Sequence, residues 1–388
     1  MTGKLVAGTT VPITARQFLC DQLRFLADQG WEVHLVTAPG PEIKDIASAF
    51  EGHPRLSFHT IPMSRAPSPA NDALALVRWI ALLSRLRPDV VVSGTPKAGL
   101  LGMLAARAAG VRSRVYLLRG LRLEGLSGVP AKISLSLERL ACAASTSVLC
   151  VSPSLQKVAA QAGLAPSDKL IVLGSGSSNG VDINKFSPPT LEERTTAREL
   201  FGIPEGVIAV GFVGRLTYDK GLPWLFAAMD EVARSRPNVW LVLAGSAIGE
   251  KHEYRSLPTD RPWFHMYGTI RDMPQFYRAL DLFCLPSLRE GFPNSTAEAL
   301  ATGIPAITTD ATGCADSVQD GKTGLVVPAR DYLALARAIE TLSDQEERRS
   351  YMGAAGRTQV LNNWSNFHVW RQISAYLVNS LQGAGGRG

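Results

Sequence analysis

The sequence predicts an α/β protein with two doubly wound, Rossmann-like domains. Its 388 residues, 46% of them hydrophobic, suffice for two or three packed domains. Short apolar runs alternate with amphipathic stretches, as expected for parallel strands buried between helices. Turn-rich segments at residues 174–180 and 187–190 interrupt this alternation. We therefore expect one domain over residues 1–184 and a second over residues 185–363.

The expected elements follow from these runs in chain order. In the first domain, a strand at residues 4–8 is followed by a helix at 17–29, which Gly30 closes. Further strands are predicted at 32–36, 89–93, 114–118, 147–151 and 170–173. After a helix at 192–201, the second domain has predicted strands at 207–213, 239–244, near 264–267, 281–285, 305–308 and 324–327. The terminal helix at 364–381 is amphipathic and can pack back on the first domain.

The charge of the chain is uneven. The net charge is +6, and residues 1–190 hold 20 basic and 12 acidic side chains. A basic half favours an anionic partner such as a nucleic acid, an acidic membrane surface or a phosphorylated acceptor, although solvated surface arginines explain it equally well. Of these partners we expect the last two and no nucleic acid.

The cysteines and the hydropathy indicate the compartment. The five cysteines are scattered, without C-x-x-C or zinc spacing, which is typical of reduced, buried thiols in a cytosolic protein. No signal-peptide pattern opens the sequence, and no run of 18 apolar residues occurs. We expect a cytoplasmic protein whose membrane contact, if any, is peripheral, at the inner face of the cell membrane.

The first candidate site is the strand–loop–helix segment at residues 211–221. A buried strand ends at Gly214, Arg215 follows, and the loop reaches Lys220 before a helix from about Leu222. Glycine lets the backbone approach a ligand, an arginine fork and a lysine neutralise a diphosphate, and the helix N-terminus adds partial positive charge. The segment predicts a phosphate site; a βα turn with two surface cations is the alternative.

The second candidate site is the segment at residues 290–298. It follows a predicted strand, places Glu290 in the loop and opens a helix through Ala301. The loop can turn Glu290 toward a sugar, while free N–H groups near Ser295 can face an anion. Glu298 has two competing roles, because Ser295-Thr-Ala-Glu298 is also a capping-box pattern in which Glu298 caps its own helix.

Two further segments are candidates for lining a ligand site. Residues 179–182, Asn-Gly-Val-Asp, carry a turn signal that fits either a loop lining a site or a hinge turn without ligand contact. Residues 119–124 follow a predicted strand, and loops after parallel strands line the ligand crevice of open α/β sheets. Arg119, Arg122 and Glu124 could face an acceptor or the donor sugar, or form a salt-bridged surface loop.

Absent patterns narrow the chemistry. No G-x-G-x-x-G follows the first strand and no G-x4-G-K-[S/T] occurs, which counts against a dinucleotide-dependent dehydrogenase and a P-loop enzyme. No Asp-x-Asp occurs either, so a carboxylate-held Mg²⁺ or Mn²⁺ on a diphosphate has no support. Protein cations would then neutralise the diphosphate, which increases the importance of Arg215 and Lys220.

Taken in order, the motifs resemble glycosyltransferase family 4, the retaining GT-B enzymes of glycosyl transferases group 1. The matching residues are 179–182, Gly-Arg-Leu at 214–216 with Lys-Gly at 220–221, Tyr-Gly at 267–268, Glu-Gly-Phe at 290–292 with Glu-Ala-Leu at 298–300, and Asp-Gly-Lys-Thr-Gly-Leu-Val-Val-Pro at 320–328. The resemblance is strongest over 175–330. It implies a GT-B fold whose two domains face each other across a cleft, with the acceptor bound by the N-terminal domain and the donor by the C-terminal one.

The resemblance also implies roles for individual residues. Arg215 and Lys220 would hold the donor diphosphate, Glu290 would lie near the hydroxyls of the transferred sugar, and Glu298 would bind the ribose. The other donor-site residues would be Gly214, Tyr267, Gly268, Ile270, Gly291, Phe292, Asn294 and Ser295. The acceptor or cleft side would contain Thr10, Thr14, Arg119, Arg122, Glu124 and Asn179. No metal and no other cofactor is implied.

The implied activity is transfer of a hexosyl or N-acetylhexosaminyl group, with retention, from a nucleotide-diphosphate sugar. The resemblance favours uridine diphosphate as the carrier. The sequence Arg-Gly-Leu-Arg-Leu-Glu at 119–124 resembles the branch that makes capsules and other surface polysaccharides, which implies a polyprenyl-diphosphate-linked acceptor. Two departures from the family stand out. Arg119 occupies a position where many members carry a histidine, and Pro293 lacks the N–H that the loop would otherwise supply.

Three alternatives stay open from the sequence. A GT-B nucleotide-sugar epimerase would bind the same donor but would act without an acceptor. A glycosyltransferase could instead act on a soluble small molecule. A binding protein with an inactive fold is disfavoured by the presence of Arg215, Lys220, Glu290 and Glu298.

Overall fold

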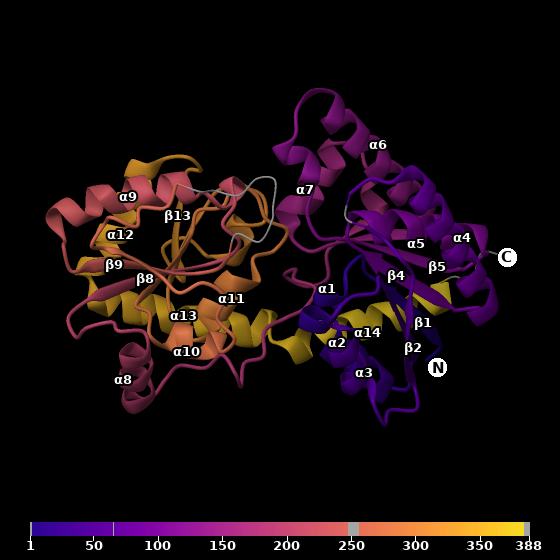
Figure 1. Cartoon of the computed structure of the whole chain (residues 1–388), viewed down its shortest axis with the longest axis horizontal. Helices are drawn as coiled ribbons and strands as arrows, with labels where there is room; N and C mark the ends of the chain where they lie inside the picture. Colours follow the sequence, from indigo (N-terminus) through magenta and orange to yellow (C-terminus); the bar gives the residue numbers. More distant parts are fainter. Residues whose placement is uncertain (1, 65, 247–255, 384–388) are drawn as a thin grey trace. The chain divides into compact units, whose positions relative to one another are not determined.

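The computed structural model describes residues 2–64, 66–246 and 256–383, and the chain forms two compact units (Figure 1). Unit 1 comprises the chain up to Asn179 together with the segment from Asn366, and unit 2 comprises Gly180–Ser365. The division lies a few residues before the expected boundary after residue 184. The terminal helix belongs to unit 1.

Unit 1 contains a seven-stranded, wholly parallel sheet in the order β3-β2-β1-β4-β5-β6-β7. Its strands are β1 (Lys4–Gly8), β2 (Glu32–Thr37), β3 (Leu56–Thr60), β4 (Val90–Gly94), β5 (Ser113–Leu118), β6 (Ser147–Cys150) and β7 (Leu170–Ile171). Its helices are α1 (Pro12–Phe18), α2 (Cys20–Asp28), α3 (Ile43–Phe50), α4 (Pro69–Leu86), α5 (Pro96–Ala108), α6 (Gly128–Ala144), α7 (Pro153–Gln161) and α14 (Asn366–Gly383).

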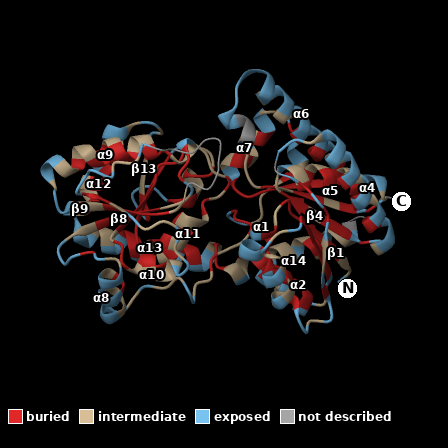
Figure 2. Ribbon diagram, in the orientation of Figure 1, coloured by how far each residue is buried: buried red, intermediate tan, exposed pale blue. Residues whose placement is uncertain are grey.

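Burial explains the arrangement of unit 1. The strand interiors are buried, as Figure 2 shows for β1 and β4, because helices cover both faces of the sheet. Trp31 and Trp79 are completely buried. Helix α14 adds Leu377 to the core beside α2, and Phe25 of α2 packs edge-on against Phe367 with ring centroids 6.2 Å apart. The amphipathic face predicted for the terminal helix is therefore used to close unit 1.

Unit 2 contains a six-stranded parallel sheet in the order β10-β9-β8-β11-β12-β13. Its strands are β8 (Ile208–Val213), β9 (Val239–Ala244), β10 (Phe264–Met266), β11 (Leu282–Leu285), β12 (Ala306–Thr309) and β13 (Gly324–Val327). Its helices are α8 (Leu191–Leu200), α9 (Leu222–Ser235), α10 (Met273–Arg278), α11 (Asn294–Ala301), α12 (Tyr332–Asp344) and α13 (Glu346–Asn363). This strand order is that of a doubly wound Rossmann-type sheet.

Two predicted helices differ from the structure, and one strand was not predicted. The helix expected at residues 17–29 is two helices, α1 and α2, which meet at Leu19. Strand β3 was not predicted, because only Leu56 of its five residues is buried. The terminal helix begins at Asn366, and Trp364 instead packs in the core of unit 2, 1% exposed.

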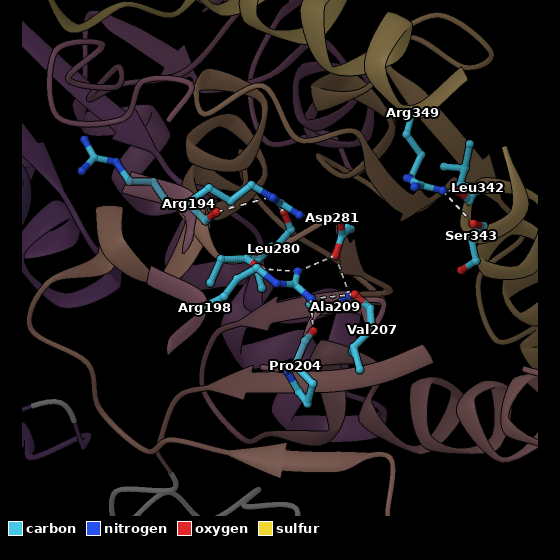
Figure 3. Close-up of polar contacts among 12 residues, drawn as sticks. Arg194, Arg198, Pro204, Val207, Ala209, Leu280, Asp281, Leu342, Ser343 and Arg349 are labelled. Atoms are coloured by element: carbon cyan, nitrogen blue, oxygen red, sulfur yellow. Dashed lines mark hydrogen bonds and ion pairs between the residues drawn. The ribbon is translucent and has the colours of Figure 1, made fainter. Parts of the chain in front are cut away.

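A charged network fixes α8 to the amino ends of β8 and β11 in unit 2 (Figure 3). Asp281, directly before β11, accepts from Arg194 Nη2 at 2.6 Å, from Arg198 Nη1 at 3.1 Å and from the Ala209 backbone N–H at 2.8 Å. The same two arginines also donate to backbone carbonyls, among them those of Leu280 and Pro204. These hydrogen bonds of Asp281 lie at the amino ends of the strands, on the side of the sheet away from the carboxyl ends.

A third arginine labelled in Figure 3 contacts the end of a helix. Arg349 of α13 donates through Nη1 to the carbonyl oxygens of Leu342 and Ser343 at 2.6 and 2.7 Å, which satisfies carbonyl groups in the last turn of α12.

Among the described helices, none is at once long enough and apolar enough to cross a membrane.

Candidate active site

The carboxyl ends of β8 and β11 position the principal candidate residues in unit 2. These two strands are neighbours at the point where the strand order reverses, since the chain continues from β8 to β9 on one side and reaches β11 on the other. Loops diverge at such a switch point and leave room for a ligand. Lys220 lies in the loop after β8, and Glu290 lies in the loop after β11.

Lys220 and Glu290 form an ion pair across this point. Lys220 Nζ lies 2.5 Å from Glu290 Oε1, and the two side chains are only 16% and 14% exposed. The Ser287 hydroxyl donates to the same carboxylate oxygen at 2.7 Å, and the Glu290 backbone N–H donates to the Thr312 carbonyl oxygen at 2.7 Å. Two residues that are 70 positions apart in the sequence are thus fixed against each other.

Further cations surround the pair. Arg289 Nη2 lies 3.3 Å from Asp219 Oδ2, and Leu288 N–H donates to the Asp219 carbonyl oxygen at 2.8 Å, so the two loops are joined twice. Burial acts to raise the pKa of Asp219, but a nearby hydroxyl and the positive charges of Arg289, Lys220 and Arg215 outweigh it and hold the pKa below its usual value. Arg215, Lys220 and Arg289 thus all act on the charge of Asp219; we call these three the cationic cluster, and Arg215 is its exposed member.

Two glycines let these loops approach each other. Gly221 has φ +77°, and a Cβ there would lie 1.9 Å from the Pro286 carbonyl oxygen. Gly313 has φ +75°, and a Cβ would lie 2.4 Å from the Glu290 carbonyl oxygen. Any other residue would be strained in backbone conformation and would push the loop after β11 away from its neighbours. The spacing between Lys220 and Glu290 depends on this close packing.

Glu298 does not cap its own helix. Helix α11 begins at Asn294 with Pro293 at the N-cap, so Ser295 lies inside the first turn and the capping-box alternative is wrong. The Tyr277 hydroxyl instead lies 2.9 Å from Glu298 Oε2 and 3.1 Å from the Ser295 carbonyl oxygen, and its single proton can serve either acceptor. Burial raises the pKa of Glu298 to about 7, although the hydrogen bond from Tyr277 lowers it.

The start of α11 presents backbone donors beside this carboxyl group. The first N–H groups of a helix have no partner within the helix, and at α11 they belong to Asn294 and Ser295, which are both partly exposed. Pro293 has no N–H, and it occupies the N-cap, where its fixed φ of about −80° is compatible with helix entry. Phe292 is packed edge-on against Trp364, with ring centroids 5.0 Å apart.

The other predicted donor-site residues of unit 2 lie at the ends of β8 and β10. Gly214 follows β8, with the Lys220 side chain 4.0 Å from the position a Cβ would take. The Tyr267 hydroxyl donates to the Phe201 carbonyl oxygen and its ring packs on Phe201, so this tyrosine is already engaged in the protein interior. Gly268 turns with φ +63°, and its carbonyl oxygen accepts from Gly245 N–H at 2.7 Å. Ile270 is partly buried against the core.

The predicted acceptor residues lie in unit 1, and three of them gather at the carboxyl edge of its sheet. Thr10, which follows β1, donates its backbone N–H to Thr95 Oγ1 at 3.1 Å, and the two hydroxyl oxygens lie 2.7 Å apart. Arg119, which follows β5, donates through Nη2 to Asn179 Oδ1 at 3.2 Å. Thr14 lies in helix α1, which begins at Pro12.

Arg119 is a partly buried side chain. Burial lowers its pKa from 12.5 to about 10, and its Nε is buried without a hydrogen-bond partner in the described structure. It lines a cavity of about 40 Å³ together with Thr9, Gln22 and apolar side chains of α2 and α14. The alternative of a salt-bridged surface loop is therefore wrong for this residue. Glu124 is exposed, and the side chain of Arg122 lies outside the described structure.

Neither a metal-ligand cluster nor a disulfide is found among the described residues. Among the described residues, no three His, Cys, Asp or Glu side chains are grouped so that they could hold a metal ion. Each of the five cysteines is buried and unbridged, and burial raises the pKa of the Cys20 thiol to about 11 and that of Cys142 to about 12. These thiols are inert packing groups.

Comparisons with known proteins agree with this geometry. The model of the family "Glycosyl transferases group 1" matches residues 193–359, and that of the family "Glycosyl transferase 4-like domain" matches residues 15–176. The capsular polysaccharide biosynthesis glycosyltransferase CapM of Staphylococcus aureus is 32% identical over 370 residues, 94% of each chain. The chain belongs to the group 1 glycosyltransferases.

Two more distant relatives bear on this glycosyltransferase. The UDP-Gal:alpha-D-GlcNAc-diphosphoundecaprenol alpha-1,3-galactosyltransferase of Escherichia coli is 25% identical over 317 residues, 80% of each chain. The structure of Anabaena Alr3699/HepE in complex with UDP-glucose superposes with a TM-score of 0.79 at 20% identity, covering 97% of this chain and 100% of that one. The likeness confirms the predicted GT-B fold class with two Rossmann-like units.

Some residues of the glycosyltransferase site were not predicted. Ser287 and Tyr277 are the hydrogen-bond partners of Glu290 and Glu298, and Arg289 adds a third cation. Ser287 and Arg289 lie within the loop that follows a predicted strand, which is the one signal that could have singled them out. Tyr277 lies in α10, 21 residues before Glu298, and its role follows only from the packing of α10 against α11.

Proposed function

We propose that this glycosyltransferase uses a UDP-sugar donor and transfers the sugar, with retention, to a hydroxyl of a polyprenyl-diphosphate-linked glycan. The product would be a precursor of a capsular or other surface polysaccharide, and no metal ion would take part. The observation that carries the proposal is the cluster of Arg215, Lys220 and Arg289 at the switch point of unit 2.

The cluster suits a diphosphate leaving group. Lys220 has three N–H donors and uses one on Glu290, so two remain for phosphate oxygens. Negative charge grows on the departing diphosphate in the transition state, where fixed cations and the N-terminus of α11 stabilise it. A leaving phosphate oxygen would take the proton of the acceptor hydroxyl, which attacks from the face that the leaving group vacates. Glu290, held by Lys220 and Ser287, would accept hydrogen bonds from sugar hydroxyls.

The acceptor is assigned to unit 1 for a chemical reason. Arg119, at the carboxyl edge of the sheet, lines a cavity with Thr9 and Thr95 and donates to Asn179 Oδ1. A cation with hydroxyl and amide neighbours suits a phosphate or sugar group. Among the relatives, the E. coli enzyme is named for a diphosphoundecaprenol acceptor and CapM for capsular polysaccharide, which supports this acceptor class. Peripheral association with the inner face of the membrane would follow from a lipid-linked acceptor.

The proposal is tested by measuring sugar transfer from radiolabelled UDP-sugars. Purified protein is incubated with each donor alone, with a membrane lipid extract, and with soluble acceptors, each in the presence of EDTA. We expect labelled lipid-linked product with the extract and an unchanged rate with EDTA. An epimerised donor in the absence of acceptor would replace the proposal with an epimerase, and dependence of the rate on Mg²⁺ or Mn²⁺ would contradict the role given to the cationic cluster.

The raised pKa of Glu298 predicts pH-dependent donor binding. If the ionised carboxylate accepts the ribose hydroxyls, binding favours the deprotonated form, whose fraction increases through a pKa of about 7. Affinity for a UDP-sugar, whose diphosphate does not titrate in this range, should therefore increase about tenfold between pH 6 and pH 8. Calorimetric titration of wild type and Glu298→Gln measures this. The variant should bind more weakly at pH 8 and lose the pH dependence, and an identical pH profile in both proteins would rule out the ribose role.

A further inference from the structure

Helix α6 of unit 1 has an unusual distribution of side chains. Val129, Ile133, Leu137 and Leu140 are 67%, 55%, 45% and 45% exposed. Their spacing of three and four residues places them on one side of the helix, along about 16 Å of its axis. A helix that only packs on a sheet turns its apolar stripe inward. The outer surface of α6 is exposed in Figure 2, so this stripe faces solvent.

The inward side of α6 is held by a polar contact. Glu138 is 5% exposed, and the Tyr116 hydroxyl of β5 donates to its Oε2 at 2.7 Å. At the end of the helix, Lys169 donates to the Cys142 carbonyl oxygen. The orientation of the helix is thereby fixed, with the carboxylate inside and the four apolar residues outside. The outward apolar stripe is a consequence of the fold and not of a rotated or frayed helix.

Cations accompany the apolar stripe. Lys132 and Arg139 lie beside it on one flank, and Arg139 also donates to the Ala162 and Gly163 carbonyl oxygens at 2.8 and 3.1 Å. Glu138 is the one acid between residues 126 and 143, and it is buried. The surrounding segment at residues 101–150 contains seven Lys or Arg and two Asp or Glu. The face therefore combines exposed apolar side chains with net positive charge.

We propose that α6 lies in the surface of an anionic lipid bilayer, with Val129, Ile133, Leu137 and Leu140 inserted among the acyl chains and Lys132 and Arg139 at the level of the headgroups. This combination of an apolar stripe and flanking cations is what an interfacial helix requires. A second copy of the chain suits the face less well, because a symmetric contact would place the same cations against each other. The inference deepens the proposed function, since it names the surface that brings unit 1 to a lipid-linked acceptor.

The test is a vesicle flotation assay. It compares three proteins, namely wild type, an α6 variant and a control variant, on two kinds of vesicle. Vesicles of phosphatidylcholine alone are compared with vesicles containing about a third phosphatidylglycerol. The variant Ile133→Glu/Leu137→Glu changes two exposed side chains of the stripe. The control Leu191→Glu/Leu200→Glu introduces the same charge in α8 of unit 2. The two leucine side chains that it replaces are 82% and 67% exposed.

Wild type and the control should float with the anionic vesicles, bind neutral vesicles at least tenfold less, and be released partly by 0.5 M salt, roughly as screening requires. The α6 variant should lose at least tenfold in binding while its UDP-sugar affinity stays unchanged. Flotation needs neither donor nor acceptor, so it is independent of whether the proposed transfer occurs. Wild type that fails to bind anionic vesicles, or an α6 variant that binds as wild type does, would overturn the inference. If sedimentation velocity showed that wild type is a dimer and the α6 variant a monomer, the face would be assigned to a second copy of the chain instead.

Discussion

Replacing Lys220 with alanine is expected to lower turnover by two to three orders of magnitude while the fold stays intact. Removing one fixed donor to a developing negative charge typically costs this much. Lys220 is held 2.5 Å from Glu290 between the loops after β8 and β11, so no neighbouring solvent cation can take its place in the same geometry. Initial rates with saturating donor and acceptor measure the change, and circular dichroism with thermal unfolding checks the fold.

Comparing Lys220→Ala with one double variant separates the effect of Lys220 on the leaving group from its effect on Glu290. Lys220→Ala leaves a half-buried carboxylate without its cation, whereas Lys220→Met/Glu290→Gln removes both charges together. Both variants should be equally slow if the cation acts on the diphosphate. Arg234→Ala, which removes a 73% exposed cation paired within its own helix, should leave the rate unchanged. Near-normal turnover in Lys220→Ala would remove the central support for the proposed function.

Replacing Asp281 with alanine should destabilise unit 2 by about 3–5 kcal/mol. The carboxylate accepts from two arginines and one backbone N–H, and its side chain is 13% exposed (Figure 3). Removing it leaves Arg194 and Arg198 partly buried without their counter-charge, which is the costly way to break an ion pair. The attachment of α8 to the starts of β8 and β11 would weaken with it.

Hydrogen exchange of the β8 and β11 amides measures this loss unit by unit, which a single unfolding midpoint cannot do for a chain with two units. Asp344→Ala is the matched control, since Asp344 pairs with Arg236 at 2.7 Å but is 55% exposed. It should cost far less than Asp281→Ala, because water screens an exposed pair. Equal losses in the two variants would mean that the network around Asp281 contributes no more than a surface pair.

Several features of this chain follow from local sequence alone. The strands β1, β9 and β13 match the predicted bounds and β8 begins one residue later than predicted, because buried runs of β-branched and aliphatic residues have one strongly favoured environment. Helix α9 begins at Leu222, where a helix was expected to start. The position of Arg215, Lys220 and Glu290 follows from the same alternation, since each lies in the connection between a strand and the α-helix that follows it. Strand β3 was not predicted, because it is an edge strand and its five residues show no clear alternation of buried and exposed side chains.

Tertiary structure alone decided which of these residues act together. The sequence placed Lys220 and Glu290 in separate motifs, and only the adjacency of β8 and β11 brings their side chains to 2.5 Å. It left Glu298 between two roles, and the start of α11 at Asn294 together with the Tyr277 hydroxyl settled its hydrogen bond. It left Arg119 between a ligand-facing position and a salt-bridged surface loop, and it gave no sign that α6 turns its apolar side outward. The physical reason is the same in each case: periodicity specifies which faces are apolar, whereas burial, pKa and pairing depend on neighbours that lie far away along the chain.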